Sequence, residues 1–63
     1  MSVDYYKRFR KDLGTQAEVA AMLEVARETI ARRETGADRI TRESGLALEA
    51  LGNRRAALLA EGT

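Results

Sequence analysis

The fold of this chain is decided by the stretch Thr15–Gly36, which reads TQAEVAAMLEVARETIARRETG. Its first threonine and Glu18, three residues later, make the pattern of a capping box, in which each side chain satisfies a backbone donor at a helix start. A helix is therefore expected over 16–23. Its apolar face carries Val19, Ala20 and Leu23.

A second helix is expected after a tight turn, over 27–35, with Gly36 just past its end. Its inner side is predicted to carry Ala26, Ile30 and the stem of Arg33. Its outer side is predicted to carry Arg27, Glu28, Ala31 and Arg32.

The two helices and their turn resemble the helix-turn-helix of the Cro and phage-repressor (XRE-type) family, whose pattern is roughly T-Q-x-x-h-A-x-x-h-G-h-S-x-x-T-h-S-x-h-E-x-G, with h apolar. The matching residues are Thr15, Gln16, Val19, Ala20, Leu23, Val25, Thr29, Ile30, Glu34 and Gly36. The flanking segments 9–14 and 46–51 resemble the end of the family's first helix and its fourth helix. The resemblance implies a lambda-repressor-like domain with its helix-turn-helix at 16–35.

Three residues depart from the family pattern. Glu24 stands where the family usually has glycine, and a left-handed conformation there costs a non-glycine residue on the order of 1 kcal/mol. Ala26 replaces the usual Ser or Thr, so a side-chain cap is missing at the second helix. Arg33 stands at a usually apolar position, so its stem must pack while its guanidinium reaches solvent or a phosphate.

Length and composition predict one small all-helical domain over 1–63. The chain has 63 residues, a formal net charge of +1, and no cysteine, histidine or proline. Strong helix formers dominate, so about five short helices are expected, in a compact bundle. Besides the two above, the expected helices cover 3–13, a segment from after Thr41 to Gly52, and a last segment capped by Asn53. Ile40, in the loop before the fourth helix, is expected to join the core.

The same composition argues against several classes of function. Without cysteine or histidine, the chain lacks the strongest side-chain nucleophile, the commonest general base and the usual zinc ligands, so no enzyme activity, metal or cofactor is expected. No small-molecule ligand is evident. The charged N-terminus does not fit a signal peptide and no apolar stretch has the length of a membrane span, so we expect a cytoplasmic protein. The resemblance implies a phage or bacterial regulator that is associated with the nucleoid of a bacterial host.

A helix fits the major groove of B-DNA, where base edges present distinct donors and acceptors. We expect Arg27, Glu28, Ala31 and Arg32 to read base edges, because their spacing puts them on one face. An intrahelical pair between Glu28 and Arg32 is an equally good reading of those two residues. Solvated helix faces remain the ordinary alternative for any basic cluster.

The resemblance also implies contacts to the DNA backbone and one internal ion pair. The residues that match backbone-phosphate contacts are Gln16, Thr29, Arg33, Arg39 and Arg42. Arg10 and Glu34 match a pair that orients the first helix against the recognition helix in relatives. Gln16 could equally be an ordinary polar residue of a first helical turn.

One recognition helix makes few base contacts, so a homodimer on a palindromic operator is expected, with half-site centres roughly 34 Å apart. The candidate dimer residues are Leu46, Leu58 and Leu59, although packing across the first helix would explain them equally. The function implied is a sequence-specific transcriptional regulator that binds double-stranded DNA, most often a repressor. The alternative is a protein-interaction module, antitoxin-like or a co-regulator, with DNA binding secondary.

Overall fold

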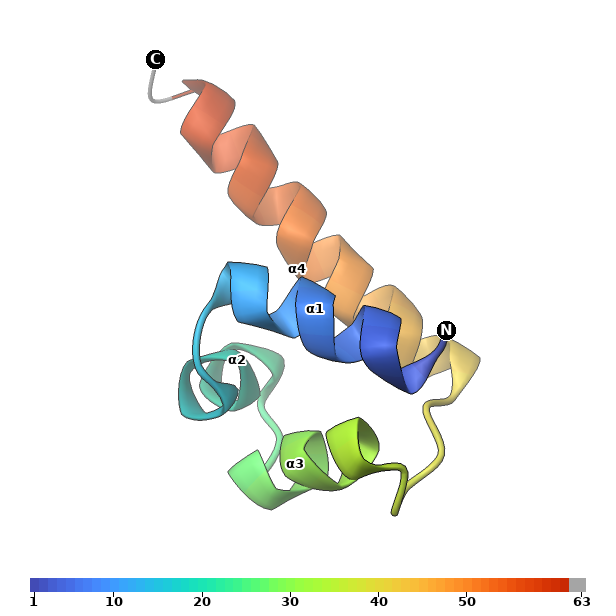
Figure 1. Cartoon of the computed structure of the whole chain (residues 1–63). Coiled ribbons are helices and arrows are strands. Elements are labelled where there is room, and N and C mark those ends of the chain that lie inside the picture. The colour runs from blue at the N-terminus through green and yellow to red at the C-terminus, as the bar shows by residue number, and fades with distance from the viewer. Residues whose placement is uncertain (62–63) are drawn as a thin grey trace.

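Four helices make up most of the chain in the computed structural model, which describes residues 1–61. They are α1 (Val3–Leu13), α2 (Gln16–Leu23), α3 (Arg27–Thr35) and α4 (Arg42–Glu61), and no strand occurs among the described residues. Helices α1, α2 and α3 and the first half of α4 pack around one core, as Figure 1 shows. The expected all-helical fold is confirmed.

Helix α1 has the bounds predicted from the sequence. The hydroxyl of Ser2 accepts a hydrogen bond from the backbone N–H of Tyr5 at 3.1 Å, which satisfies a free donor of the first turn. Gly14 ends the helix, and its N–H donates to the carbonyl of Arg10 at 3.1 Å. Asp4 in the first turn also has the sign that suits the helix dipole.

Helix α2 begins with the predicted capping box. The N–H of Glu18 donates to the Thr15 hydroxyl at 3.1 Å, and the N–H of Thr15 donates to the Glu18 carboxylate at 3.0 Å. Hydrogen bonding of the Glu18 carboxylate by Thr15, first through the backbone N–H and then through the side chain, lowers the pKa of Glu18, because it favours the charged form.

The turn between α2 and α3 contains the strained residue that the sequence indicates. Glu24 lies in the left-handed region, with φ 58° and ψ 40°, and it is the only non-glycine residue of the described chain with positive φ. The N–H of Val25 donates to the carbonyl of Ala20 at 3.0 Å, which closes the end of α2. The turn therefore forms without glycine.

Ala26 starts α3 as its N-cap and makes no side-chain hydrogen bond there. The expectation that Ala26 lies on the inner side of α3 is wrong, since it is exposed. Its backbone is extended rather than helical, so its side chain does not follow the periodicity of the helix it precedes. The N–H of Thr29 donates to its carbonyl at 3.0 Å and begins the helical ladder.

The core lies between all four helices. Its fully buried apolar residues are Tyr6, Val19, Ala20, Ile30 and Leu48. The partly buried apolar residues packed around them are Phe9, Leu13, Leu23, Val25, Ile40 and Leu51. The apolar face expected for 16–23 and the inward positions expected for Ile30 and Ile40 are confirmed.

The two helices expected after Thr41 are one continuous helix. α4 has 20 residues and runs through Gly52 and Asn53 without a break, so the expected helix end and the expected N-cap are both wrong. A Cβ built on Gly52 would lie 2.5 Å from Cε1 of Phe9. Gly52 therefore permits α1 to approach α4 closely, which is a packing role for glycine within a helix rather than a terminating one.

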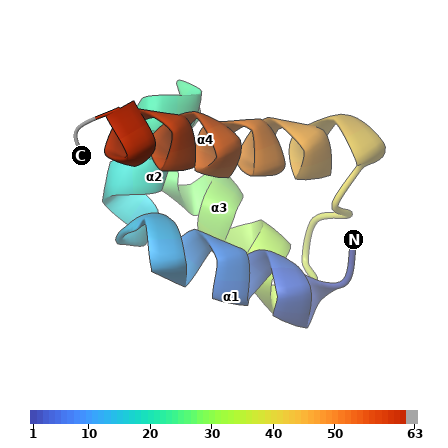
Figure 2. The same cartoon turned by 90° about the horizontal axis from the view of Figure 1, so that it is seen from above.

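Beyond Gly52, α4 leaves the core. We call residues 53–61 the arm, and Figure 1 shows it as the end of α4 that projects past the other helices, while Figure 2 shows from above that α4 is one unbroken helix. The radius of gyration is 11.6 Å and the longest dimension is 40 Å. A compact domain of this length has a radius of about 10.6 Å. The excess reflects the projecting arm.

Candidate nucleic-acid interface

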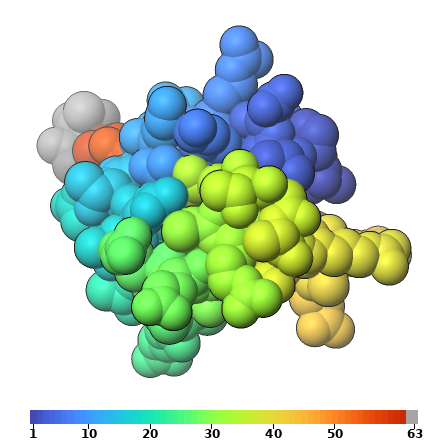
Figure 3. Space-filling model, turned by 60° about the horizontal axis from the view of Figure 1, so that its bottom comes forward, coloured from blue at the N-terminus to red at the C-terminus, as the bar shows by residue number. Residues whose placement is uncertain are grey.

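The outer side of α3 is open to solvent. Arg27, Glu28 and Arg32 are exposed and Ala31 is half-buried, so all four residues expected to read bases lie on or at the edge of this side. Figure 3 shows the face that α3 occupies, with residues of α2 on one side and the loop before α4 on the other. The arm lies away from this face.

The inner side of α3 is fixed to α1 by a buried ion pair. The Nε and Nη2 atoms of Arg10 donate to the two carboxylate oxygens of Glu34, each at 2.7 Å. Arg10 also donates from Nη1 to the carbonyl of Gly14 at 3.1 Å. This two-pronged geometry fixes both distance and orientation, so it sets how α3 sits on α1.

The electrostatics of this pair match its geometry. Burial acts to raise the pKa of Glu34, but hydrogen bonds from Arg10 and Gln16 and the positive charges of Arg10 and Lys7 outweigh it, so the pKa is lowered. The hydrogen bond to Glu34 raises the pKa of Arg10. Both side chains are therefore held in their charged forms.

Gln16 connects this pair to the start of α3. Its Nε2 donates to Glu34 at 3.4 Å, and its Oε1 accepts from Nη1 of Arg27 at 3.3 Å. A residue expected to contact phosphate and one expected to read bases are thus neighbours at the junction of α2 and α3. The chain of contacts runs from Arg10 to the exposed surface.

Arg32, at the other end of α3, pairs with a residue that the sequence did not single out. Its Nη2 lies 3.0 Å from Oδ1 of Asp38, and the side chains remain 62% and 38% exposed. Within residues 1–61, the ion-pair partner of Arg32 is therefore Asp38 and not Glu28. No sequence signal identifies Asp38, because the contact depends on the path of the loop after Gly36.

The remaining expected phosphate contacts are spread over several elements. Arg39 and Arg42 are exposed, in the loop before α4 and at its first residue. Arg33 is half-buried and donates from Nη1 to the hydroxyl of Tyr6 at 3.2 Å, so its guanidinium lies against α1. Thr29 is half-buried. The structure therefore presents Arg39 and Arg42 to solvent more fully than Arg33 and Thr29.

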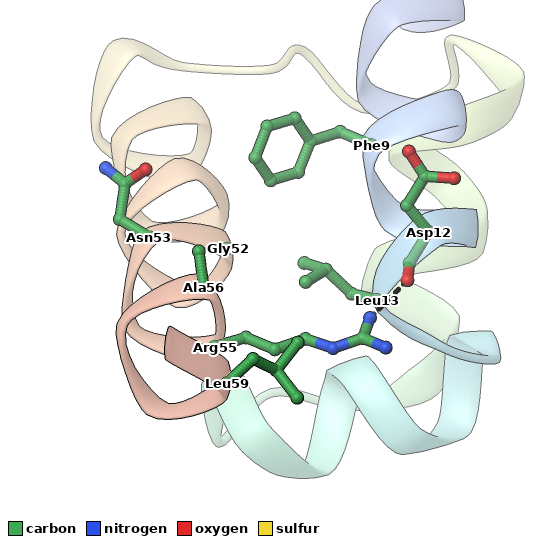
Figure 4. Close-up of a pocket in the computed structure, with 8 residues that line it drawn as sticks. All are labelled: Phe9, Asp12, Leu13, Gly52, Asn53, Arg55, Ala56 and Leu59. Carbon is green, nitrogen blue, oxygen red and sulfur yellow. Dashed lines mark hydrogen bonds between the residues drawn. The ribbon is translucent and has the colours of Figure 1, made fainter. Parts of the chain in front are cut away.

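The three leucines expected at a dimer interface are all exposed, but they do not share one surface. Leu46 is separated from Leu59 by 13 residues, which is about 140° around an α-helix and about 20 Å along it. Leu46 lines a hollow with Met1 and Ile40. Leu59 instead lines a separate groove between α1 and α4 (Figure 4).

The charge on the α3 face is positive although the whole chain is nearly neutral. Segment 27–42 contains five arginines and three acidic residues. Two of the acidic residues, Glu34 and Asp38, are in ion pairs. The local balance therefore favours a polyanion near α3, where the field matters for binding.

Comparison with family models, with curated proteins and with solved structures gave no match to this chain. Among residues 1–61, no helix combines the length and apolar composition needed to cross a membrane. Over the same range, no three His, Cys, Asp or Glu side chains are grouped so that they could hold a metal ion.

Proposed function

We propose that this chain is a sequence-specific DNA-binding transcriptional regulator, built as a lambda-repressor-like helix-turn-helix domain with α3 as its recognition helix. The proposal joins the resemblance of 15–36 to XRE-type proteins with the arrangement of α2, the turn and α3. The turn residue Glu24 adopts the left-handed conformation that the family usually gives to glycine.

One observation carries the proposal: α3 is anchored on its inner side and open on its outer side. Glu34 on the inner side accepts hydrogen bonds from Nε and Nη2 of Arg10, while Arg27 and Arg32 on the outer side are exposed. An α-helix with its side chains is about 10–12 Å across, and the major groove is about 12 Å wide, so α3 can be seated in it. A rigid support behind exposed donors favours base reading.

The exposed residues then take distinct roles. Arg27 and Arg32 donate to guanine edges, Glu28 accepts from cytosine, and Ala31 provides apolar contact with a thymine methyl group. Gln16, Arg39 and Arg42 contact phosphates on either side of the groove, with smaller contributions from Thr29 and Arg33. These phosphate contacts set register, and the base contacts set sequence.

A homodimer on a palindromic operator follows from the small number of base contacts. Each good base contact contributes about 1–3 kcal/mol of discrimination, which is small against the number of competing sites in a genome. Two copies of α3 at half-sites roughly 34 Å apart double the sequence that is read. Occupation of a promoter by such a dimer would repress transcription.

The experiment that tests the proposal is selection of bound duplexes from a random pool, followed by salt titration of the selected sequence. We expect a palindromic motif with G·C pairs in each half, and affinity that falls steeply as salt rises. Arg32→Ala should change the selected motif. Arg8→Ala, which removes the same charge from an exposed position of α1, is the matched control and should select the same motif.

Absence of binding at low salt would overturn the proposal. A chain that binds no duplex but captures one protein partner through the α3 face would support the protein-interaction alternative instead.

A further inference from the structure

The arm is a helical segment without a covering element. Each of residues 53–61 is exposed, and its two leucines, Leu58 and Leu59, are 60% and 62% exposed. A helix of this length gains little stability from intrinsic propensity, because most helical stability in proteins comes from packing of an apolar face. The arm therefore exposes an apolar face, with Leu58 and Leu59, that no other described helix covers.

This apolar face continues the core stripe of α4. Leu59 is 11 residues after the buried Leu48, and Leu58 is seven residues after the half-buried Leu51, so each lies within about 20° of its counterpart around the helix. Leu46 lies outside this stripe. The arm thus extends, beyond the edge of the body, the same face that packs against α1 and α2.

A groove opens beside the arm. It has a volume of about 310 Å³ and lies between the C-terminal half of α1 and the second half of α4. Phe9 and Leu13 form one wall, and Gly52, Ala56 and Leu59 form the other, as Figure 4 shows. Arg55 spans the two helices by donating to the backbone carbonyl of Asp12. The walls are mainly apolar and accept aliphatic side chains.

We propose that the occupant of this groove is a second copy of the chain, with each copy placing Leu58 and Leu59 against the α1–α4 groove of the other about a two-fold axis. The two parts of such a contact, a groove and protruding leucines, occur side by side on one molecule. A surface that is complementary to itself in this way forms a closed dimer.

Charge on the contact surface favours the same occupant. The contact surface carries both signs of charge, with Arg54 and Arg55 on the arm, Glu61 at its end and Asp12 at the groove, so two copies meet without a large excess of like charge. A strongly basic or strongly acidic partner would gain no net electrostatic attraction from a surface on which the two signs of charge balance. The charge of the contact surface therefore suits a second copy of the chain.

The dimer leaves α3 accessible. Figure 1 places the end of the arm and α3 on opposite sides of the body, and Figure 3 shows the α3 face free of the arm. Such a dimer would present two copies of α3 to the two half-sites of an operator, and this role rests on the proposed function. Self-association itself is measured without DNA, so the two proposals can fail separately.

The first test compares Leu58, which lies in the apolar stripe of α4, with Leu46, which lies outside it. The two leucines have similar exposure. Sedimentation equilibrium should show a wild-type dimer. Leu58→Asp should raise the dissociation constant at least tenfold, whereas Leu46→Asp should leave it unchanged. Circular dichroism of both variants confirms that they are helical.

A second measurement uses the folded wild-type chain. The chain has no cysteine, so a spin label on Ala57→Cys, an exposed arm position that does not line the groove, is at a single position. Mixed with isotopically labelled wild-type chain, it should broaden the amide signals of Phe9 and Leu13 in the unmodified copy. Broadening around Leu46 instead, a monomeric wild type at millimolar concentration, or dissociation by Leu46→Asp alone would each overturn the inference. Dimerisation through the arm with no DNA binding would overturn only the proposed function.

Discussion

Arg32 and Asp38 form an ion pair at the end of α3, with 3.0 Å between Nη2 of the arginine and Oδ1 of the aspartate. The same residues are joined through the backbone, where the N–H of Asp38 donates to the carbonyl of Arg32 at 3.2 Å. An exposed pair of this kind contributes at most about 1 kcal/mol to stability. Its consequence is positional, because it restricts the guanidinium of a residue proposed to read a base.

Asp38→Ala should therefore lower sequence discrimination. The freed Arg32 guanidinium loses orientation, and loss of a negative charge near the DNA strengthens binding to every duplex. We expect the ratio of non-specific to specific dissociation constants to fall about fivefold, which corresponds to ~1 kcal/mol. Titration of selected and scrambled duplexes measures this ratio. Asp4→Ala, with the same charge change in α1, should leave it unaltered, and a higher ratio in Asp38→Ala would contradict the assignment.

Arg32→Ala and Arg39→Ala should weaken DNA binding in different ways. Loss of Arg32 should relax preference at one base pair per half-site by about 1–3 kcal/mol. Loss of Arg39 should weaken all sequences alike and reduce the slope of log affinity against log salt by about one. Competition with single-base variants of the operator, repeated at several salt concentrations, separates the two effects. Identical profiles for the two variants would refute the division of roles.

Glu34→Gln should destabilise the fold by about 3 kcal/mol, because it leaves the Arg10 guanidinium buried without its counter-charge. Urea denaturation measures the free energy of unfolding. In a domain this small, the single variant will be largely unfolded. The double variant Arg10→Met with Glu34→Leu is the control: it removes both charges and should be more stable than Glu34→Gln. If the double variant has a lower free energy of unfolding than Glu34→Gln, the attraction between Arg10 and Glu34 contributes more than the cost of removing the two charges from water.

Stability of the wild type should decrease in acid. The pKa of Glu34 in the folded chain lies below its ordinary value of 4.5, so its contribution is present above that pH and is lost as pH falls through the lower folded value. The pKa of Glu18 is also lowered, so its contribution to stability is likewise lost as the pH falls below 4.5. Thermal unfolding measured from pH 6 downward should show a shallower decline in the double variant Arg10→Met with Glu34→Leu, with the remainder including Glu18. An equal decline would assign the acid sensitivity elsewhere.

Glu24→Gly should stabilise the fold by roughly 0.5–1 kcal/mol, because glycine adopts the left-handed conformation of this turn without steric strain. Gly36→Ala is the converse test: φ is 82° there, and an added Cβ would meet no atom within 4 Å. It should destabilise by about 1 kcal/mol through the backbone alone. Melting curves of both variants measure the effects, which should have opposite signs. Changes of the same sign would mean that side-chain contacts of Glu24 outweigh its backbone strain.

The first three helices could be predicted from local signals. Hydroxyl and carboxylate caps, glycine ends and the periodicity of apolar residues act within a few residues of each boundary, so they are readable from the chain alone. The same signals misled at Gly52 and Asn53, where a long-range contact decides the structure. Gly52 faces the ring of Phe9, which lies 43 positions earlier, and the sequence around Gly52 gives no signal of this contact.

The candidate site was predictable to a similar extent. The residues that face outward from α3 follow from helical spacing, which depends only on where the helix begins. The partners of those residues do not: Asp38 reaches Arg32, and Tyr6 reaches Arg33, through the course of a loop and the crossing of two helices. Pairings of this kind require the tertiary structure.

The unbroken course of α4 makes its two halves turn as one rod. An insertion of one residue after Gly52 would rotate every later side chain by about 100° and point Leu58 and Leu59 away from the groove. Seven inserted residues would bring them back to within about 20° and move the tip about 10 Å outward. In the proposed dimer, a change in the length of this helix would keep the leucines in place only near whole-turn steps, and the separation between two copies of α3 would change in the same increments.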